Sequence, residues 1–78
     1  MKWNEFRAWL ETEKKISHRG TSDVLSRVRR VLTILNATSI DADSYAKLLE
    51  HDNYKTLSVT IRSQMKRSIA LYLEFLRP

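Results

Sequence analysis

Apolar residues recur every three or four positions along most of this chain, which is the spacing of an amphipathic helix. The pattern is clearest in the second of four such segments, whose inward positions are Val24, Leu25, Val28, Val31, Leu32 and Leu35. Thr21 or Ser22 is the expected N-cap, because a hydroxyl there can accept a hydrogen bond from an unpaired backbone N–H. The polar run 36–39 then predicts a turn.

The other three segments have the same period and complete an all-α prediction. Their expected extents are Trp3 to Lys15, then Asp41 or Asp43 to His51-Asp52-Asn53, and finally Thr56 or Ser58 to Leu76. Their inward side chains are predicted to be Trp3, Phe6, Trp9 and Leu10, then Tyr45, Leu48 and Leu49, and then Ile61, Met65, Ser68, Ile69, Tyr72, Leu73 and Leu76. No stretch has the alternation of a strand. The sequence therefore predicts a small, orthogonally packed four-helix bundle that forms one domain over residues 1–78.

Composition limits the classes of function. The chain has 78 residues, 42% of them apolar and none of them cysteine, so it can build one cooperative core without disulfides or cysteine-based zinc sites. No apolar run approaches the roughly 20 residues that cross a bilayer. The first ten residues already carry Glu5 and Arg7, so neither a signal peptide nor a membrane anchor is expected, and the expected compartment is the cytoplasm.

Charge is segregated along the chain, although the net value is only +5. Residues 14–35 hold six Lys or Arg and one Asp, and residues 53–78 hold five Lys or Arg and one Glu. The segment 36–52 between them holds four acids and one Lys. Two basic segments of this kind favour a polyanionic partner on one side of the fold, with plain solvation of the helix faces as the alternative.

The candidate contacts lie on the outer faces of the second and fourth helices and in the turns that precede them. A helix N-terminus offers free N–H groups and a positive dipole end to a phosphate, although ordinary N-capping explains the same hydroxyls. Ser22, Ser26 and Arg30 are the candidates for reading base edges. The full set of predicted DNA contacts is Ser17, His18, Arg19, Thr21, Ser22, Ser26, Arg27, Arg29, Arg30, Lys55, Thr56, Ser58, Arg62, Lys66 and Arg67.

Catalytic and metal-binding patterns are weak by comparison. His18 and His51 lie in different loops, and neither has a second ligand at metal-binding spacing, so both are interpreted as surface histidines. Asp41 and Asp43 precede a helix and lack the glycine and closing glutamate of a calcium loop. We therefore expect no metal, no cofactor, no small-molecule substrate and no active site.

Several short motifs occur in an order that resembles the N-terminal core-binding domain of tyrosine recombinases and phage integrases, a helical domain often described as SAM-like. The resemblance covers about Phe6 to Pro78. Its motifs are Phe6-Arg7-Ala8-Trp9-Leu10, Ser17-His18-Arg19-Gly20-Thr21, Ser26-Arg27-Val28-Arg29-Arg30-Val31-Leu32, Leu57-Ser58-Val59-Thr60-Ile61 and Tyr72-Leu73-Glu74-Phe75-Leu76. Leu25 stands where the family often has a tyrosine, and Gly20 is less usual in that turn.

This resemblance implies a non-catalytic domain that clamps duplex DNA opposite a later catalytic domain, with other protomers on the same DNA. The family's catalytic residues lie in that later domain, so Tyr72 is not the nucleophile, and Arg77-Pro78 would suit the start of an interdomain linker. One alternative is a SAM-like protein-interaction module without DNA affinity, in which the acidic third helix meets the basic faces of a neighbour. A small enzyme is a third and weaker alternative, because no acid, base and nucleophile converge in the sequence.

Overall fold

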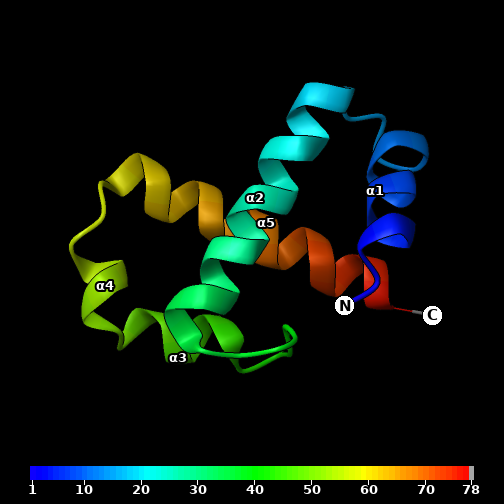
Figure 1. The fold of residues 1–78 in the computed structure, drawn as a ribbon. Coiled ribbons are helices and arrows are strands. Elements are labelled where there is room, and N and C mark those ends of the chain that lie inside the picture. The colour runs from blue at the N-terminus through cyan, green and yellow to red at the C-terminus, as the bar shows by residue number, and fades with distance from the viewer. Residues whose placement is uncertain (78) are drawn as a thin grey trace.

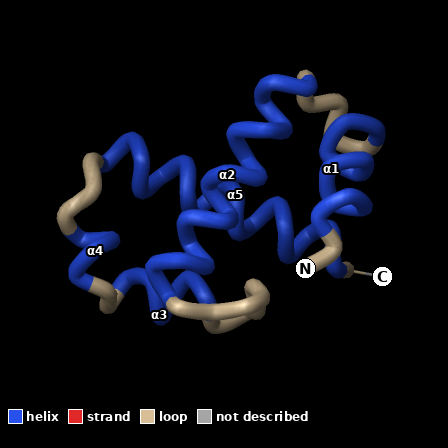
Figure 2. The backbone as a smooth tube through the Cα atoms, in the orientation of Figure 1, coloured by secondary structure: helices blue, strands red, loops and turns tan. Residues whose placement is uncertain are grey.

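The computed structural model describes residues 1–77, and these residues form helices and loops without a strand (Figures 1 and 2). In this part of the chain the helices are α1 (Trp3–Thr12), α2 (His18–Leu35), α3 (Ser44–Leu49), α4 (Asp52–Lys55) and α5 (Val59–Leu76). The all-α prediction is confirmed. The predicted number of helices is wrong, because residues 52–55 form a separate short helix instead of the end of the third one.

Two long helices organise the molecule. Figure 1 shows α2 crossing α5 near the centre, and these two helices pack against each other. At one end α1 packs against both α2 and the C-terminal part of α5. At the other end α3 packs against α2 and α5, and α4 connects α3 to the start of α5. The two basic segments of the sequence therefore supply the two central helices.

The core lies along this crossing. Its buried apolar residues are Phe6, Leu10, Val24, Leu25, Val28, Val31, Ile40, Leu48, Tyr54, Met65, Ile69, Leu71 and Tyr72. Most of the predicted inward positions in α1, α2 and α5 are among them or pack against them. Leu49 and Leu76 were predicted to face inward, but they are 45% and 44% exposed. Leu71, which falls outside the predicted stripe of α5, is buried instead.

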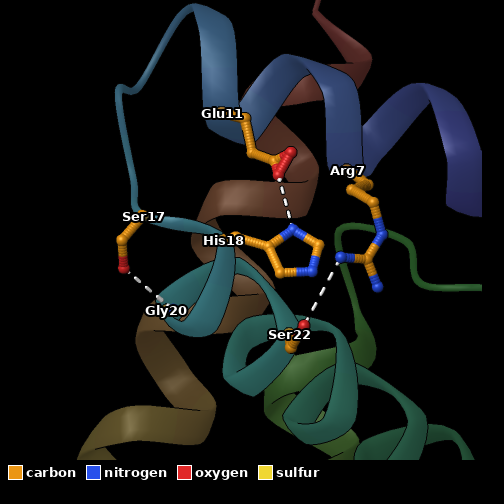
Figure 3. A network of polar contacts seen from close by, with 6 residues as sticks. All are labelled: Arg7, Glu11, Ser17, His18, Gly20 and Ser22. Carbon is orange, nitrogen blue, oxygen red and sulfur yellow. Dashed lines mark hydrogen bonds and ion pairs between the residues drawn. The ribbon is translucent and has the colours of Figure 1, made fainter.

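The connection between α1 and α2 differs from the prediction at both ends. Helix α1 ends at Thr12 because Lys15 takes a left-handed conformation, with φ of 53°, and the Ile16 N–H bonds back to the Leu10 carbonyl at 3.0 Å. Helix α2 then begins at His18. Ser17 is its N-cap, and its hydroxyl accepts a hydrogen bond from the Gly20 N–H at 3.1 Å (Figure 3). The proposed caps Thr21 and Ser22 are wrong, because both lie inside the helix.

The predicted turn after α2 is confirmed. Asn36 has a left-handed φ of 51°, which asparagine tolerates better than most residues. Its N–H donates to the Thr33 carbonyl at 3.2 Å, and the Ala37 N–H donates to the Leu32 carbonyl at 2.9 Å. This is the hydrogen-bond pattern of a Schellman motif, which satisfies the last carbonyls of the helix.

The acidic segment is organised by side-chain hydrogen bonds instead of a simple cap. The Asp41 carboxylate accepts from the Asp43 N–H at 2.9 Å and from the Ser44 hydroxyl at 3.3 Å, while that hydroxyl accepts from the Asp41 N–H at 2.9 Å. Asp43 precedes α3 without a side-chain cap of its own. His51 does not end α3. It is the N-cap of α4, and its Nδ1 accepts a hydrogen bond from the Asn53 N–H at 3.3 Å.

The long fourth segment of the sequence is confirmed as α5, with Ser58 as its N-cap and Leu76 as its last helical residue. Arg77 follows in an extended conformation. The rest of the suggested linker, Pro78, lies outside the described residues. Among residues 1–77, no helix is long and apolar enough to cross a membrane.

Candidate nucleic-acid interface

Most of the basic residues lack a carboxylate partner. Residues 1–77 contain two ion pairs, one between Lys14 and Glu74 at 2.6 Å and one between His18 and Glu11 at 3.2 Å. None of the predicted DNA-contacting lysines and arginines takes part in either. These eight cations are Arg19, Arg27, Arg29, Arg30, Lys55, Arg62, Lys66 and Arg67. In the described part of the chain, none of these eight charges is therefore paired with a carboxylate.

Helices α2 and α5 bring two of these cations to one hollow of about 270 Å³. Arg27 comes from α2 and Arg67 from α5, and Gln64 and Ser68 of α5 also line it. Gln64 was not among the predicted DNA contacts, although it lies one helical turn before Ser68 and therefore on the same face of α5. This hollow joins the two basic segments, which are far apart in the sequence.

Gly20 forms part of the wall of this hollow. A Cβ atom at this position would lie 2.9 Å from Ile16 Cγ2 and 3.2 Å from the capping Ser17 Oγ. Real side chains do not approach so closely, so an alanine here would push the Ile16 side chain and the cap apart. The glycine thus permits the close approach of Ile16 and Ser17 at the start of α2.

The cations of α2 do not form a single stripe. At about 100° per residue, Arg27 and Arg29 lie roughly 160° apart around the helix axis. The Arg29 guanidinium turns toward α1, where its Cζ lies 4.8 Å from the centre of the Trp3 ring. Arg30 and Ser26 fall between these flanks and are exposed. The outward surface of α2 is therefore basic over a broad arc.

The cations at the start of α5 face α3 and α4. Lys66 Nζ lies 5.4 Å from the centre of the Tyr45 ring. Arg62, Lys66 and Tyr45 line a second hollow, which is separate from that of Arg27 and Arg67. The Tyr54 hydroxyl donates to the Arg62 backbone carbonyl at 3.2 Å. Burial raises the pKa of Tyr54 above its usual value, and the hydrogen bond and charge of Tyr45 raise it further, while the Arg62 guanidinium opposes them. Arg62 Nε is buried without a hydrogen-bond partner.

The turn before α2 is less suited to a phosphate than the sequence suggests. His18 Nδ1 lies 3.2 Å from the Glu11 carboxylate, and the Ser22 hydroxyl accepts from Arg7 at 3.4 Å (Figure 3). The Glu11 carboxylate of α1 thus lies beside the N-terminus of α2, where it would repel an anion. The sequence did not predict Arg7 as the partner of Ser22.

Thr21 must be removed from the predicted contacts, because it is completely buried and its hydroxyl has no hydrogen-bond partner. It sits on the inward side of α2, one turn before Val24 and Leu25. Ser17 and Arg19 are exposed, and the Ser17 side chain is used as the N-cap. Arg19 is thus the residue of this turn that stays available to a phosphate.

The turn before α5 keeps its exposed polar residues. The Ser58 hydroxyl accepts from the Ile61 N–H at 3.2 Å, so its capping role is clear. The Thr56 hydroxyl donates to the Asn53 carbonyl at 3.3 Å, and Lys55 is exposed on α4. No acidic side chain pairs with any of these residues in the described part of the chain.

No cluster of three His, Cys, Asp or Glu residues that could hold a metal ion occurs among residues 1–77. No protein-family model, curated protein or solved structure matches this chain.

Proposed function

We propose that this chain is a non-catalytic, SAM-like DNA-binding domain that grips duplex DNA mainly through its phosphates. The observation that carries the proposal is the hollow between α2 and α5, which is lined by Arg27 and Arg67, neither of which has a carboxylate partner among residues 1–77. A phosphate bound in this hollow could pair with both arginines at once.

The remaining cations extend this surface. Arg67 is exposed on α5, and Arg30 lies outward on α2 beyond Arg27. Arg19 lies near the start of α2. A duplex laid over the outward side of α5 and the adjoining flank of α2 would meet several phosphate-binding side chains, while base reading would fall to Ser26 and Arg30.

The motifs that resemble the core-binding domain of tyrosine recombinases and phage integrases support the same proposal. In that role the domain works in the cytoplasm and contributes grip, while a separate catalytic domain and other protomers on the DNA supply chemistry and assembly.

The direct test is a fluorescence-anisotropy titration of the 78-residue chain against a labelled duplex of random sequence, repeated at several salt concentrations. We expect micromolar or weaker binding with a log–log salt slope of about −4 to −6, because each neutralised phosphate contributes about −0.9. Replacing Arg27 and Arg67 together with glutamine should reduce the magnitude of the slope by about 2.

The matched control removes the same amount of charge elsewhere. Lys2 and Lys47 are exposed and lie outside the proposed interface, so the double glutamine variant at these positions should leave the slope nearly unchanged. Equal losses in both double variants would show that only net charge matters. Absence of binding even at low salt would reject the proposal and favour a protein-interaction module.

A further inference from the structure

A second hollow lies between α5 and the α3–α4 region, on the flank of α5 away from the Arg27–Arg67 hollow. Its volume is about 270 Å³, and its lining includes Tyr45, Leu49, Val59, Arg62 and Lys66. Small-molecule sites usually have volumes of roughly 300–1,000 Å³. This hollow is therefore of a size to hold one side chain of a larger partner instead of a whole cofactor.

Apolar side chains on its rim are unusually exposed. Leu49 is 45% exposed and Val59 is 68% exposed, and they are two of the three large aliphatic residues in the described chain that stand out in this way. They come from different helices, α3 and α5, and converge on one hollow. Such a grouping is typical of a surface that binds an apolar anchor residue, because covering it removes both side chains from water.

The charged part of the lining is entirely positive. Arg62 and Lys66 follow each other at one helical turn on α5, and neither has a carboxylate partner in the described chain. The Lys66 ammonium lies over the Tyr45 ring, 5.4 Å from its centre. Arg62 Nε is buried without a hydrogen-bond partner, so a carboxylate that drew the guanidinium outward would relieve that cost.

We propose that this hollow, which we call the Tyr45–Arg62 hollow, is a docking site for an acidic peptide segment of a partner protein. One apolar side chain of the peptide enters between Leu49 and Val59, and flanking carboxylates pair with Arg62 and Lys66. The aliphatic rim favours a peptide over a nucleic-acid base, which would stack on an exposed aromatic face instead. This inference does not depend on the proposed DNA-binding function.

The test uses NMR spectroscopy of the ¹⁵N-labelled 78-residue chain, which detects weak binding and locates it. The probes are end-blocked peptides in which a central Leu, Ile, Met or Phe is flanked on each side by two Glu. We expect at least one of them to shift the amide signals of Leu49, Val59, Arg62 and Lys66 saturably. Replacing the central residue with Gly, or the four Glu with Gln, should each abolish most of the shift.

A pair of variants separates the hollow from general electrostatics. Val59→Glu places a negative charge on the rim, whereas Thr60→Glu places the same charge in the same turn of α5 but on another side of the helix. An acid in the first turn favours the helix in both cases, so both variants should fold. Peptide affinity should fall about tenfold or more with Val59→Glu and little with Thr60→Glu.

Four results would overturn the inference. No peptide of the panel shifts these four signals, or Thr60→Glu weakens binding as much as Val59→Glu. The signals shift with protein concentration alone, which would make a second copy of the chain the occupant. A single-stranded oligonucleotide, but no peptide, shifts them, which would make nucleic acid the occupant. The double glutamine variant of Arg27 and Arg67 tests the proposed DNA-binding function separately, so its duplex affinity neither supports nor contradicts peptide docking.

Discussion

At the scale of single residues, Tyr54 shows how a short helix is tied to a long one. Its side chain is only 3% exposed, and its hydroxyl reaches across to the Arg62 carbonyl of α5 at 3.2 Å. The acceptor is a backbone carbonyl, so the bond exists only while Tyr54 keeps its proton. Burial is the main reason that the pKa of Tyr54 is raised, and the proton is thus held more firmly in the folded protein than in the unfolded chain.

This arrangement predicts an alkaline loss of stability. The unfolded chain releases the tyrosine proton near pH 10, before the folded protein does, so the contribution of Tyr54 is complete below pH 10 and is lost as the pH rises further. Tyr54→Phe should cost about 0.5–1.5 kcal/mol at neutral pH, because the hydrogen bond is lost while the ring remains. Urea unfolding from pH 7 to 11 should show the difference between the two proteins shrinking above pH 10. A constant difference would contradict this account.

At the scale of elements, Ser58 at the N-terminus of α5 has a structural role as a cap and a predicted role in DNA binding. Ser58 accepts a hydrogen bond from the Ile61 N–H at 3.2 Å and also belongs to the predicted DNA contacts. Ser58→Ala should destabilise the protein by about 1 kcal/mol, the usual cost of losing a cap. Ser58→Asp should restore stability, because a carboxylate also caps and interacts well with the helix dipole. Urea unfolding of both variants measures these changes.

The same pair of variants tests the phosphate contact. If Ser58 lies beside a DNA phosphate, the aspartate variant should bind the duplex more weakly than the alanine variant, although it is the more stable protein. Equal duplex affinity of the two variants would leave Ser58 with a capping role alone. Stability and binding therefore move in opposite directions only if the residue has both roles.

Helix periodicity predicted the long elements better than the short ones. The repeating apolar positions were sufficient for α2 and α5, whose central turns agree with the structure. Caps were harder, because Ser17, Thr21 and Ser22 are all suitable by chemistry, and the choice depends on the reversal at Lys15. Helix α4 has four residues, too few for any period, and it depends on the His51 cap and the Tyr54 contact.

At the scale of the whole molecule, the grouping of the candidate site could not be predicted from the sequence. Each cation was found from the two basic segments, 14–35 and 53–78. That Arg27 and Arg67 line one hollow, while Arg29 lies against Trp3, follows from the way α2 crosses α5 and from the packing of α1. The hollow near Tyr45 was missed for a similar reason, because Leu49 was expected to face inward.

The two ends of the chain are joined by an aromatic cluster, and this cluster governs whether α1 stays in place. Phe6 is completely buried, with its ring centre 5.0 Å from that of Tyr72 and 5.3 Å from that of Phe75. The neighbouring ion pair of Lys14 and Glu74 is partly exposed and should contribute only about 0.2–1 kcal/mol. Removing a buried phenylalanine costs about 3–5 kcal/mol, so packing outweighs the ion pair.

Phe6→Ala should therefore bring the protein to the edge of unfolding, since domains have only about 0.05–0.15 kcal/mol of stability per residue. Circular dichroism should show a large fall in the thermal midpoint together with loss of helicity in α2 and α5, because a chain of 78 residues unfolds as one unit. Phe6→Leu keeps most of the volume and should remain folded with a smaller loss. The opposite result would be a Phe6→Ala variant that loses only the helical signal of one short helix and keeps the thermal midpoint of the wild-type protein. That result would show that the two long helices are stable without α1. In that case the Arg27–Arg67 hollow would lose the support of Ile16, which precedes α2, but would keep Gly20 and its two arginines. Duplex binding by the same variant would then show whether the DNA requires an intact wall or the arginines alone.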